Sequence, residues 1–169
     1  MKERVHIRPG SLDDETEFLA AVARSRTLHH PWVQAPNTPE AFRDYFLKQE
    51  SSRFAGFFIW RDEPRALVGV VNVSEMLLGS FRSAYLGYYA FTPYAGRGFM
   101  KDGLAQVITH AFTVIKLHRL EANIQPGNAP SKALVKALGF RREGFSRRYL
   151  KINGRWRDHE RWAILSEDW

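Results

Sequence analysis

Apolar residues recur along the chain with two spacings, every second residue in some segments and every third or fourth residue in others. The first spacing is typical of half-buried strands, and the second is typical of helices that cover one face of a sheet. The expected strands span residues 5–8, 54–60, 66–73, 84–91, 119–124, 145–152 and 155–165. The expected helices span residues 12–26, 40–49, 97–116 and 129–138. This order predicts an α/β fold with a mixed, mostly antiparallel central sheet flanked by about four helices.

Residue types at the ends of these segments support the boundaries. Ser11 and Asp14 have the three-residue spacing of a helix N-terminal capping box. Asn128 is placed to cap the last helix, since its side chain accepts well from main-chain N–H groups. Asn153 and Gly154 form the strongest short hairpin signal in the sequence, because both tolerate the positive φ of a tight turn. We therefore expect the last two strands to form an antiparallel hairpin.

Length and composition restrict the class of protein. A chain of 169 residues is long enough for one hydrophobic core, and without a linker or repeat we expect a single domain over residues 1–169. Cysteine is absent, which excludes a disulfide scaffold, a thiolate zinc site and a cysteine nucleophile. No segment approaches the roughly 18 apolar residues of a membrane-spanning helix, and the start lacks the apolar stretch of a signal peptide. We therefore expect a soluble, cytoplasmic protein without membrane association.

Positive charge is concentrated in the last third of the chain. Residues 1–50 carry 7 Lys and Arg against 8 Asp and Glu, whereas residues 101–161 carry 13 against 5. This surplus favours an anionic ligand, or an acidic or nucleic-acid-rich partner. A basic face that serves only solubility is an equally open interpretation. The histidines show no metal-ligand spacing, so no metal site is expected.

Residues 88–100 join a predicted strand to the longest predicted helix through a turn that contains Gly96 and Gly98. Main-chain N–H groups at the start of a helix bind phosphate, and glycine lets an anion approach closely. Two known phosphate loops are excluded. The dinucleotide fingerprint requires glycine where Lys101 stands, and the Walker loop requires Gly-Lys followed by Ser or Thr. A different phosphate site and a purely structural turn both remain open.

Two motifs carry a resemblance to a known family. Residues 95–100, Ala-Gly-Arg-Gly-Phe-Met, match the motif Gln/Arg-x-x-Gly-x-Gly/Ala at Gly98 and depart from it at the first and last positions. Residues 128–131, Asn-Ala-Pro-Ser, and 138–140, Leu-Gly-Phe, match a second motif downstream. In these motifs and in its element order, the sequence resembles the GNAT acyl-CoA N-acetyltransferases, and among them the RimJ/RimL type that acetylates ribosomal-protein N-termini.

The resemblance implies acetyl-CoA as co-substrate, no metal, and direct attack of an amine on the thioester without a covalent enzyme intermediate. It implies that the strand before the glycine turn binds pantetheine through its main chain, and that the turn binds the pyrophosphate. The cofactor-binding residues that it implies are Tyr89, Ala90, Phe91, Ala95, Gly96, Arg97, Gly98, Phe99, Met100 and Asn128.

The resemblance is less complete for catalytic residues. Many relatives have a tyrosine general acid where this chain has Val135, whereas the Rim type is assigned a serine at the position of Ser131. Ser131 is therefore expected to protonate the leaving thiolate, with helix capping as the alternative role. Arg148 stands where Rim-type relatives can have a carboxylate base. Glu75, isolated in an apolar stretch, is the candidate to orient a water or bind the acceptor ammonium, and an exposed turn residue is its alternative.

Trp32 and Tyr149 are expected to bind the acceptor, because the resemblance places their segments on the acceptor side. The neighbouring pair Asp158 and His159 is interpreted as structural. A weak base favours an α-amine, with a pKa of about 7.7 to 8.0, over a lysine near about 10.4. We therefore expect a protein N-terminal α-amine as acceptor, with ribosomal proteins and the ribosome among the candidate partners.

Two alternatives stay open. One is the same chemistry on a small amine, such as an antibiotic, a polyamine or an amino acid. The other is a non-catalytic relative that binds the ribosome or RNA, which the mixture of cations and aromatic residues in the tail also favours. The sequence leaves the oligomeric state open.

Overall fold

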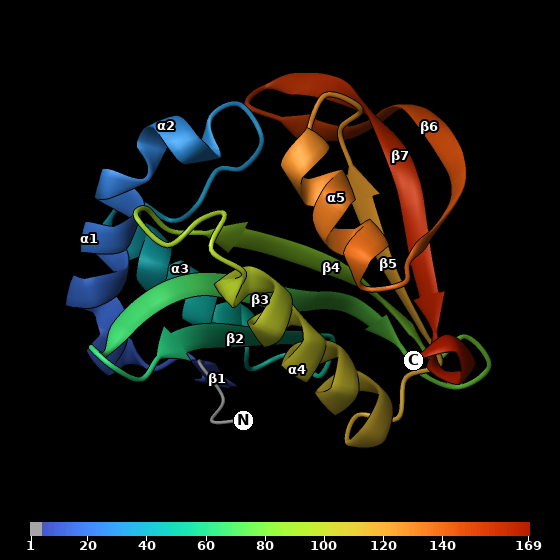
Figure 1. Cartoon of the computed structure of the whole chain (residues 1–169), viewed down its shortest axis with the longest axis horizontal. Coiled ribbons are helices and arrows are strands. Elements are labelled where there is room, and N and C mark those ends of the chain that lie inside the picture. The colour runs from blue at the N-terminus through green and yellow to red at the C-terminus, as the bar shows by residue number, and fades with distance from the viewer. Residues whose placement is uncertain (1–4) are drawn as a thin grey trace.

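A computed structural model describes residues 5–169, in which one seven-stranded sheet has helices packed on both faces (Figure 1). The strands are β1 (Val5–Pro9), β2 (Phe54–Arg61), β3 (Ala66–Leu77), β4 (Ser83–Ala90), β5 (Arg119–Ile124), β6 (Arg141–Ile152) and β7 (Arg155–Leu165). The α-helices are α1 (Glu15–Arg24), α2 (Arg26–His29), α3 (Pro39–Lys48), α4 (Phe99–Thr113) and α5 (Ala129–Ala137), with short 3₁₀ turns over Leu12–Asp14 and Ser166–Asp168. The predicted α/β class and mixed sheet are confirmed, with five α-helices in the described residues instead of about four.

The strand order is β1-β2-β3-β4-β5-β7-β6, and one neighbouring pair differs from the others. β1 to β4 form an antiparallel meander, and β5, β7 and β6 also pair antiparallel. β4 and β5 are parallel, and they pair only over residues 83–85 and 119–121. Beyond these residues the two strands separate, so the sheet opens between their C-terminal halves (Figure 1).

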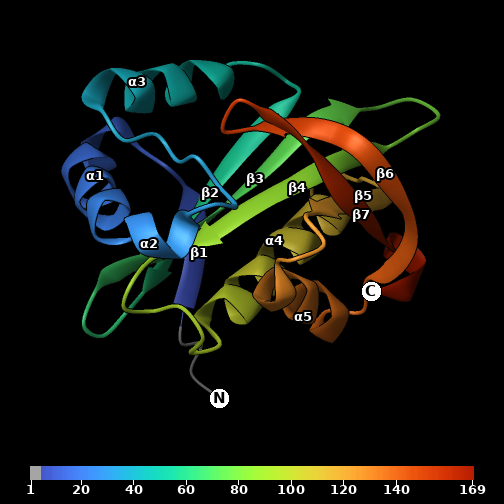
Figure 2. The same ribbon diagram turned by 90° about the horizontal axis from the view of Figure 1, so that it is seen from above.

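The sheet separates two hydrophobic cores. α4 and α5 cover one face, where Ile59, Leu104 and Val135 are buried together, and α1 and α3 cover the other, where Phe18 and Phe58 meet (Figure 2). The adjacent residues Phe58 and Ile59 therefore enter opposite cores. Because side chains alternate along a strand, a one-residue slip would exchange the two sets, and burial on both faces fixes the register.

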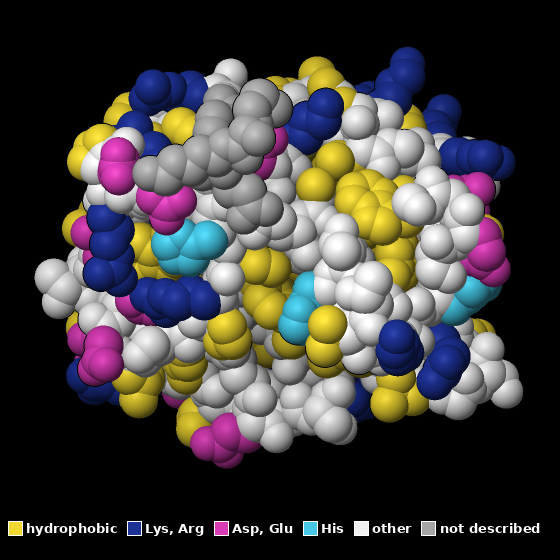
Figure 3. Space-filling view, turned by 60° about the horizontal axis from the view of Figure 1, so that its bottom comes forward, with side chains coloured by type: hydrophobic (Ala, Val, Ile, Leu, Met, Phe, Trp, Pro, Cys, Tyr) yellow, Lys and Arg dark blue, Asp and Glu magenta, His cyan; other side chains and the backbone are white. Residues whose placement is uncertain are grey.

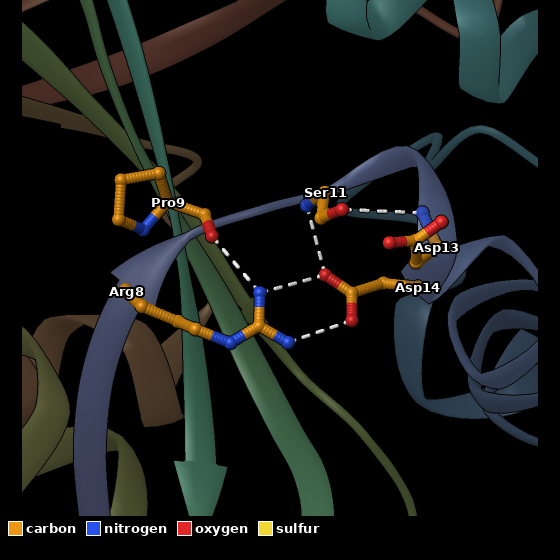
Figure 4. Close-up of polar contacts among 5 residues, drawn as sticks. All are labelled: Arg8, Pro9, Ser11, Asp13 and Asp14. Atoms are coloured by element: carbon orange, nitrogen blue, oxygen red, sulfur yellow. Dashed lines mark hydrogen bonds and ion pairs between the residues drawn. The ribbon is translucent and has the colours of Figure 1, made fainter.

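The first helical segment begins at the capping box predicted from Ser11 and Asp14. Ser11 Oγ accepts from the Asp13 N–H at 3.2 Å, and the Ser11 N–H donates to Asp14 Oδ2 at 2.8 Å (Figure 4). Arg8 of β1 donates to both carboxylate oxygens of Asp14, at 2.7 and 2.8 Å. Burial raises the pKa of Asp14, but its hydrogen bonds with Arg8 and Ser11 outweigh burial and hold that pKa below its ordinary value. This bidentate pair ties β1 to the start of the first helix.

Several boundaries differ from the prediction. The helix expected over 12–26 is divided into a 3₁₀ turn, α1 and α2, because the buried Ser25 leaves the helical ladder and its hydroxyl accepts from a main-chain N–H beyond β4. His29, expected to open a loop, is the last residue of α2. β3 extends to residue 77 instead of 73, through a register irregularity that places Glu75 at a φ of 51°. β6 begins at 141 instead of 145, and α4 spans 99–113 instead of 97–116.

The edge strand β6 carries exposed cations, which are Arg141, Arg142, Arg147, Arg148 and Lys151. On the face seen in Figure 3, by contrast, most Lys and Arg side chains lie around the edges, and the centre is occupied by hydrophobic groups, histidine and other groups that are neither Lys nor Arg. A large part of the charge surplus counted over residues 101–161 is therefore located at one edge of the sheet. Among residues 5–169, no helix combines the length and the hydropathy that a membrane span requires.

Candidate active site

A cavity of about 500 Å³ lies where β4 and β5 separate. Residues 86–90 of β4 form one wall, and residues 122–125, at the end of β5, form the wall opposite. The other lining residues come from α2 and the loop after it, the glycine turn and the first turn of α4, α5 with the residue before it, and the β6–β7 hairpin. Segments far apart in the sequence therefore meet at the one place where the sheet is open.

Side-chain alternation divides the cavity lining between the two faces of the sheet. In β4, Leu86 and Tyr88 face the core under α4 and α5, whereas Tyr89 faces the core under α1 and α3. In β5, Ile124 faces α4 and α5, so Asn123 faces the other side. We call the side with Tyr88, the glycine turn and α5 the α5 half of the cavity, and the side with Tyr89, Asn123 and α2 the α2 half.

The α5 half contains a hydrogen-bonded pair of hydroxyls. Tyr88 Oη and Ser131 Oγ are 2.8 Å apart, and both residues line the cavity. Burial raises the pKa of Tyr88 to about 12, although the hydrogen bond with Ser131 opposes that shift. The Tyr88 hydroxyl is therefore protonated at neutral pH. Asn128 caps α5, because its Oδ1 accepts from the Ser131 N–H at 3.2 Å, so the Ser131 hydroxyl is not the cap of this helix.

The turn before α4 presents main-chain N–H groups to the same half. Gly96 and Gly98 have φ angles of 74° and 85°, in the left-handed region that favours glycine. A Cβ at Gly96 would meet nothing within 4 Å, so backbone conformation and not space requires glycine there. The first N–H groups of the 15-residue α4 have no helical partner and lie at the positive end of its dipole. With the exposed Lys101 also lining the cavity, this end is suited to an anion.

Main-chain groups of β4 also face the opening. Phe91 donates its N–H to the Val68 carbonyl of β3 at 2.9 Å, which places the odd-numbered residues of β4 in the ladder with β3. The antiparallel pattern then turns the N–H and C=O groups of Tyr88 and Ala90 toward the gap. The Ala90 carbonyl accepts from His29 Nε2 at 2.8 Å, in agreement with that direction. The Ala90 N–H consequently faces the cavity.

Two residues of the α2 half each have a buried polar atom with no hydrogen-bond partner among the described residues, Tyr89 Oη and Asn123 Oδ1. Two histidines line the same cavity, His29 from α2 and His159 from β7. Burial lowers the pKa of each imidazole by more than its hydrogen bond to a main-chain carbonyl raises it. No described residue that lines the cavity is Asp or Glu. Nowhere in residues 5–169 do three or more potential metal-ligating side chains gather.

The loop after α2 and the tip of the β6–β7 hairpin meet over the α2 half (Figures 1 and 2). Asn153 Nδ2, at the hairpin tip, donates to the Pro31 carbonyl at 3.4 Å. Trp32 reaches across to the turn before α5, where a Cβ on Gly127 would lie 3.1 Å from the indole. A second cavity of about 420 Å³, lined by this loop, α3 and β4, shares Val33 and residues 87–89 with the first.

The structure brings together most of the residues expected to bind cofactor. Those that line the cavity are Tyr89, Ala90, Ala95, Gly96, Gly98, Met100 and Asn128, together with Ser131 and Trp32. Phe91, Arg97 and Phe99 do not line it, and Phe91 and Phe99 are buried in the two hydrophobic cores. Glu75 is exposed, pairs with Arg53 and lines neither cavity, so the structure does not bring it near Ser131.

The β6–β7 hairpin separates the roles of residues that are close in sequence. Arg148, at a φ of 47°, donates its N–H to Asp158 Oδ1 at 2.7 Å, where β6 leaves the register of β7. Tyr149 does not line the cavity, and its ring centre lies 6.2 Å from that of His159. Asp158 thus stabilises an irregular part of β6, while its neighbour His159 reaches the cavity.

Tyr88 and Asn123 were not identified as cavity residues from the sequence, which favoured a structural role for the pair Asp158 and His159 over a catalytic one. Alternation along the strand predicted at 119–124 already placed Asn123 opposite the apolar face of that strand, which is a usable signal. Nothing in the sequence pairs Tyr88 with Ser131, 43 positions away. Their contact depends on how α5 packs against β4.

The fold is that of an acyltransferase, and comparison with known proteins identifies the family. Residues 4–141 match the family described as Acetyltransferase (GNAT) domain, and the chain belongs to that family. It is an N-acetyltransferase. The resemblance stated from the motifs is confirmed.

Three relatives illustrate the similarity. A Bacillus subtilis protein named Probable N-acetyltransferase YjcK is 30% identical over 172 residues, which cover 97% of this chain and 95% of the relative. The ribosomal protein uS5-alanine N-acetyltransferase of Escherichia coli is 37% identical over 124 residues, 73% of this chain and 63% of the relative. The match therefore spans less than two thirds of that relative. The solved structure of Mycobacterium smegmatis RimJ in complex with CoA-disulfide has a TM-score of 0.88 at 29% identity and covers 96% of this chain and 82% of that one.

Proposed function

We propose that this protein transfers the acetyl group of acetyl-CoA to the α-amino group of a protein N-terminus, by direct attack of the amine on the thioester. The observation that carries the proposal is the cavity at the open part of the sheet, lined from both faces. Two reactants can approach one point there from opposite sides. In this proposal the α5 half receives acetyl-CoA and the α2 half receives the acceptor.

Acetyl-CoA suits the α5 half because both of its extended parts find matching groups there. The pyrophosphate is anionic, and the turn at Gly96 and Gly98 offers main-chain N–H groups at a helix N-terminus beside Lys101. Pantetheine carries amides, and the N–H and C=O groups of Tyr88 face the gap as the edge of an open sheet. The M. smegmatis RimJ structure, which contains CoA-disulfide, supports the same class of co-substrate.

The α5 half also supplies the groups that the reaction requires. The amine nitrogen forms a bond to the carbonyl carbon, the C–S bond breaks, and the departing thiolate takes a proton. Ser131 gives that proton and recovers it from Tyr88, whose hydroxyl is 2.8 Å away. The Ala90 N–H is the donor we assign to the developing oxyanion. Since the chain contains no cysteine, direct transfer is favoured over a thioester intermediate on the enzyme.

An α-amine is favoured over a polyamine by the charge of the α2 half. No described lining residue is Asp or Glu, so the cavity offers no carboxylate to neutralise a polycation. An α-amine with a pKa of about 7.7 to 8.0 is substantially neutral near pH 8, whereas a lysine near about 10.4 requires a stronger base. Glu75 receives no role in this proposal, because it lies outside both cavities.

Ribosomal proteins are the acceptors we propose, and a peptide that begins with alanine is the first to test. The E. coli relative is named for an alanine of ribosomal protein uS5. The cationic edge formed by β6 would attract a phosphate-rich particle at low ionic strength. A cytoplasmic location agrees with such a partner and remains a prediction.

The proposal is tested by following the free thiol of CoA, which this cysteine-free chain does not obscure. We expect turnover with the alanine peptide, none with the same peptide blocked at its N-terminus, and poor turnover with spermidine or an aminoglycoside. Turnover on ribosomal particles should fall as salt increases, because salt screens the cationic edge. Efficient, salt-insensitive acetylation of spermidine with none of the peptide would contradict the acceptor assignment.

A further inference from the structure

We infer that His159 accepts the proton of the attacking amine and that Asn123 orients this amine, an assignment that rests on the proposed transfer to an α-amine. The proposed transfer has a donor for the thiolate proton, Ser131, but it still requires an acceptor for the amine proton. Glu75 is outside both cavities, and no described lining residue is a carboxylate. A base must then be sought among the other titratable groups that line the α2 half.

His159 occupies the required side of the sheet. Trp162 and Ile164 of β7 pack in the core under α4 and α5, and Glu160 is held on that side by the Trp162 Nε1 hydrogen bond at 3.1 Å. Alternation then directs His159 to the opposite side, which is the side of Asn123. The side chain is only 3% exposed, and it lines the cavity.

The hydrogen bond of His159 determines which ring nitrogen can accept a proton. Nδ1 lies 2.9 Å from the Arg157 carbonyl oxygen, which can only accept, so Nδ1 carries the hydrogen. In the neutral ring the lone pair is then on Nε2, and Nε2 has no hydrogen bond among residues 5–169. A neutral imidazole with an unoccupied nitrogen is the form that general-base catalysis requires.

A second, independent observation points to a ligand at the same place. Asn123 Oδ1 is buried and has no partner among the described residues, and an unpaired buried acceptor is costly unless a ligand satisfies it. Asn123 lies directly opposite Arg161 in the β5–β7 ladder, two residues along from His159. Such diagonal neighbours are about 7 to 8 Å apart, which leaves room for one amine between them. In this proposal an amine bound between the two residues directs one N–H toward the Asn123 side chain and another toward His159 Nε2.

His29, the other histidine of this half, is less suited to the role. Its Nε2 is engaged with the Ala90 carbonyl at 2.8 Å. Its ring packs against Tyr89 and the fully buried Phe91, at centroid distances of 5.2 and 5.8 Å. These contacts fix α2 against β4, so we assign His29 the role of holding β4 in position.

The proton transfers balance with this assignment. As the C–N bond forms, the amine gives one proton to His159 Nε2, and the imidazolium later releases it to solvent through the open cavity. As the C–S bond breaks, the thiolate receives a proton from Ser131, which is restored through Tyr88 from solvent. One proton leaves the α2 half for each proton that enters the α5 half, and the products are the amide and the CoA thiol.

The test compares His159→Asn with the wild-type enzyme under conditions in which acetyl transfer limits the rate. An asparagine amide can still donate to the Arg157 carbonyl from the position of Nδ1, but it has no equivalent of Nε2. The matched control is His110→Asn, which changes a half-buried histidine of α4 that packs on Phe57 outside the cavity. Melting temperature and the Kd for acetyl-CoA report on folding and on the α5 half.

We expect His159→Asn to lower kcat for the alanine peptide by about 10²-fold or more, as is typical of a lost general base. The acetyl-CoA Kd and the peptide KM should stay within about threefold of wild type, and His110→Asn should keep the wild-type kcat. A kcat for His159→Asn within about threefold of wild type would overturn the inference but leave the proposed function intact. An inactive wild-type enzyme would instead contradict the proposed function.

A second measurement separates proton transfer from packing. Imidazole added to His159→Ala should restore part of the activity, and pyrazole, a much weaker base of the same shape, should not. Restoration by both compounds, or by neither, would make His159 a packing residue and overturn the assignment.

Discussion

Tyr88→Phe removes a single hydroxyl and keeps the ring that packs between β4 and the α4–α5 core. The deleted group is the 2.8 Å hydrogen-bond partner of Ser131. One such bond contributes about 1 kcal/mol to the free energy of unfolding, and water in the cavity can replace it at the serine. For a chain of this length, a loss of about 1 kcal/mol lowers Tm by about 2 to 4 °C. Folding should therefore be almost unaffected.

The effect on turnover should be much larger. Ser131 would have to recover its proton from water instead of from Tyr88, and loss of a general acid typically lowers kcat by about 10² to 10⁴. We expect a decrease near the lower limit for Tyr88→Phe, with the acetyl-CoA Kd within a few fold of wild type. Because both hydroxyls belong to one proton path, Tyr88→Phe combined with Ser131→Ala should be no slower than Ser131→Ala alone.

The control is Tyr85→Phe on the same strand. Tyr85 also has a pKa raised to about 12, chiefly by its hydrogen bond to another tyrosine, but it faces the other side of the sheet and does not line the cavity. It should lose a similar amount of stability and keep its kcat. Stopped-flow thiol release and thermal melts of the four variants measure both quantities. Unchanged kcat in Tyr88→Phe, or effects of Tyr88→Phe and Ser131→Ala that multiply in the double variant, would refute the proton path.

Two further predictions concern Lys101 in the cavity and the Arg8–Asp14 pair at the start of the first helix. Lys101→Glu should weaken acetyl-CoA binding about five- to thirtyfold at low salt, and the difference should shrink in 0.5 M salt, because screening reduces an exposed charge interaction. Calorimetric titration at the two salt concentrations measures the Kd of both proteins. Equal Kd values for the variant and the wild type at low salt would remove Lys101 from the pyrophosphate site. Arg8→Met should lower the free energy of unfolding at pH 7 by about 1 to 3 kcal/mol, because Asp14 loses its bidentate hydrogen-bond partner. The folded-state pKa of Asp14 lies below its ordinary value, so this stabilisation is present above about pH 4 and is lost as pH falls through that lowered pKa. Urea melts at pH 7 and at successively lower pH should show a difference that shrinks as pH falls through the lowered pKa, and a difference of equal size at every pH would exclude the charge pair as its cause.

The elements of the fold were predictable because each has a local cause in the sequence. The capping box at Ser11 and Asp14, the turn at Asn153 and Gly154, and the apolar spacing of α4 all depend on residues within one or two turns of each other. The extension of β3 was not predictable, since residues 74–77 pair with β4 through an irregular register that only the neighbouring strand determines. The division of the first helix could not be predicted either, because the Ser25 hydroxyl accepts from a main-chain N–H that is 67 residues away in the sequence.

The part of the candidate site that is formed by main-chain groups could be predicted from the sequence. The part that is formed by side chains from several packed elements could not. The turn with Gly96 and Gly98 could be recognised in the sequence, because a left-handed backbone conformation favours glycine at these positions. Tyr88 and His159 come to the cavity only when α5 packs on β4 and when β7 pairs with β5. Glu75 shows the opposite error, since an acidic residue in an apolar stretch suggested a site, and it lies exposed at the irregular end of β3.

The most direct test of the account is to locate the acetyl group on a peptide that offers both kinds of amine. The peptide begins with alanine, carries one internal lysine, and is incubated with enzyme and acetyl-CoA at pH 8. Tandem mass spectrometry then assigns the added acetyl group from the fragment masses. The account predicts acetylation of the N-terminal α-amine with the lysine unmodified, because the cavity lining contains no described carboxylate to deprotonate a lysine. Acetylation of the lysine with a free N-terminus would contradict it.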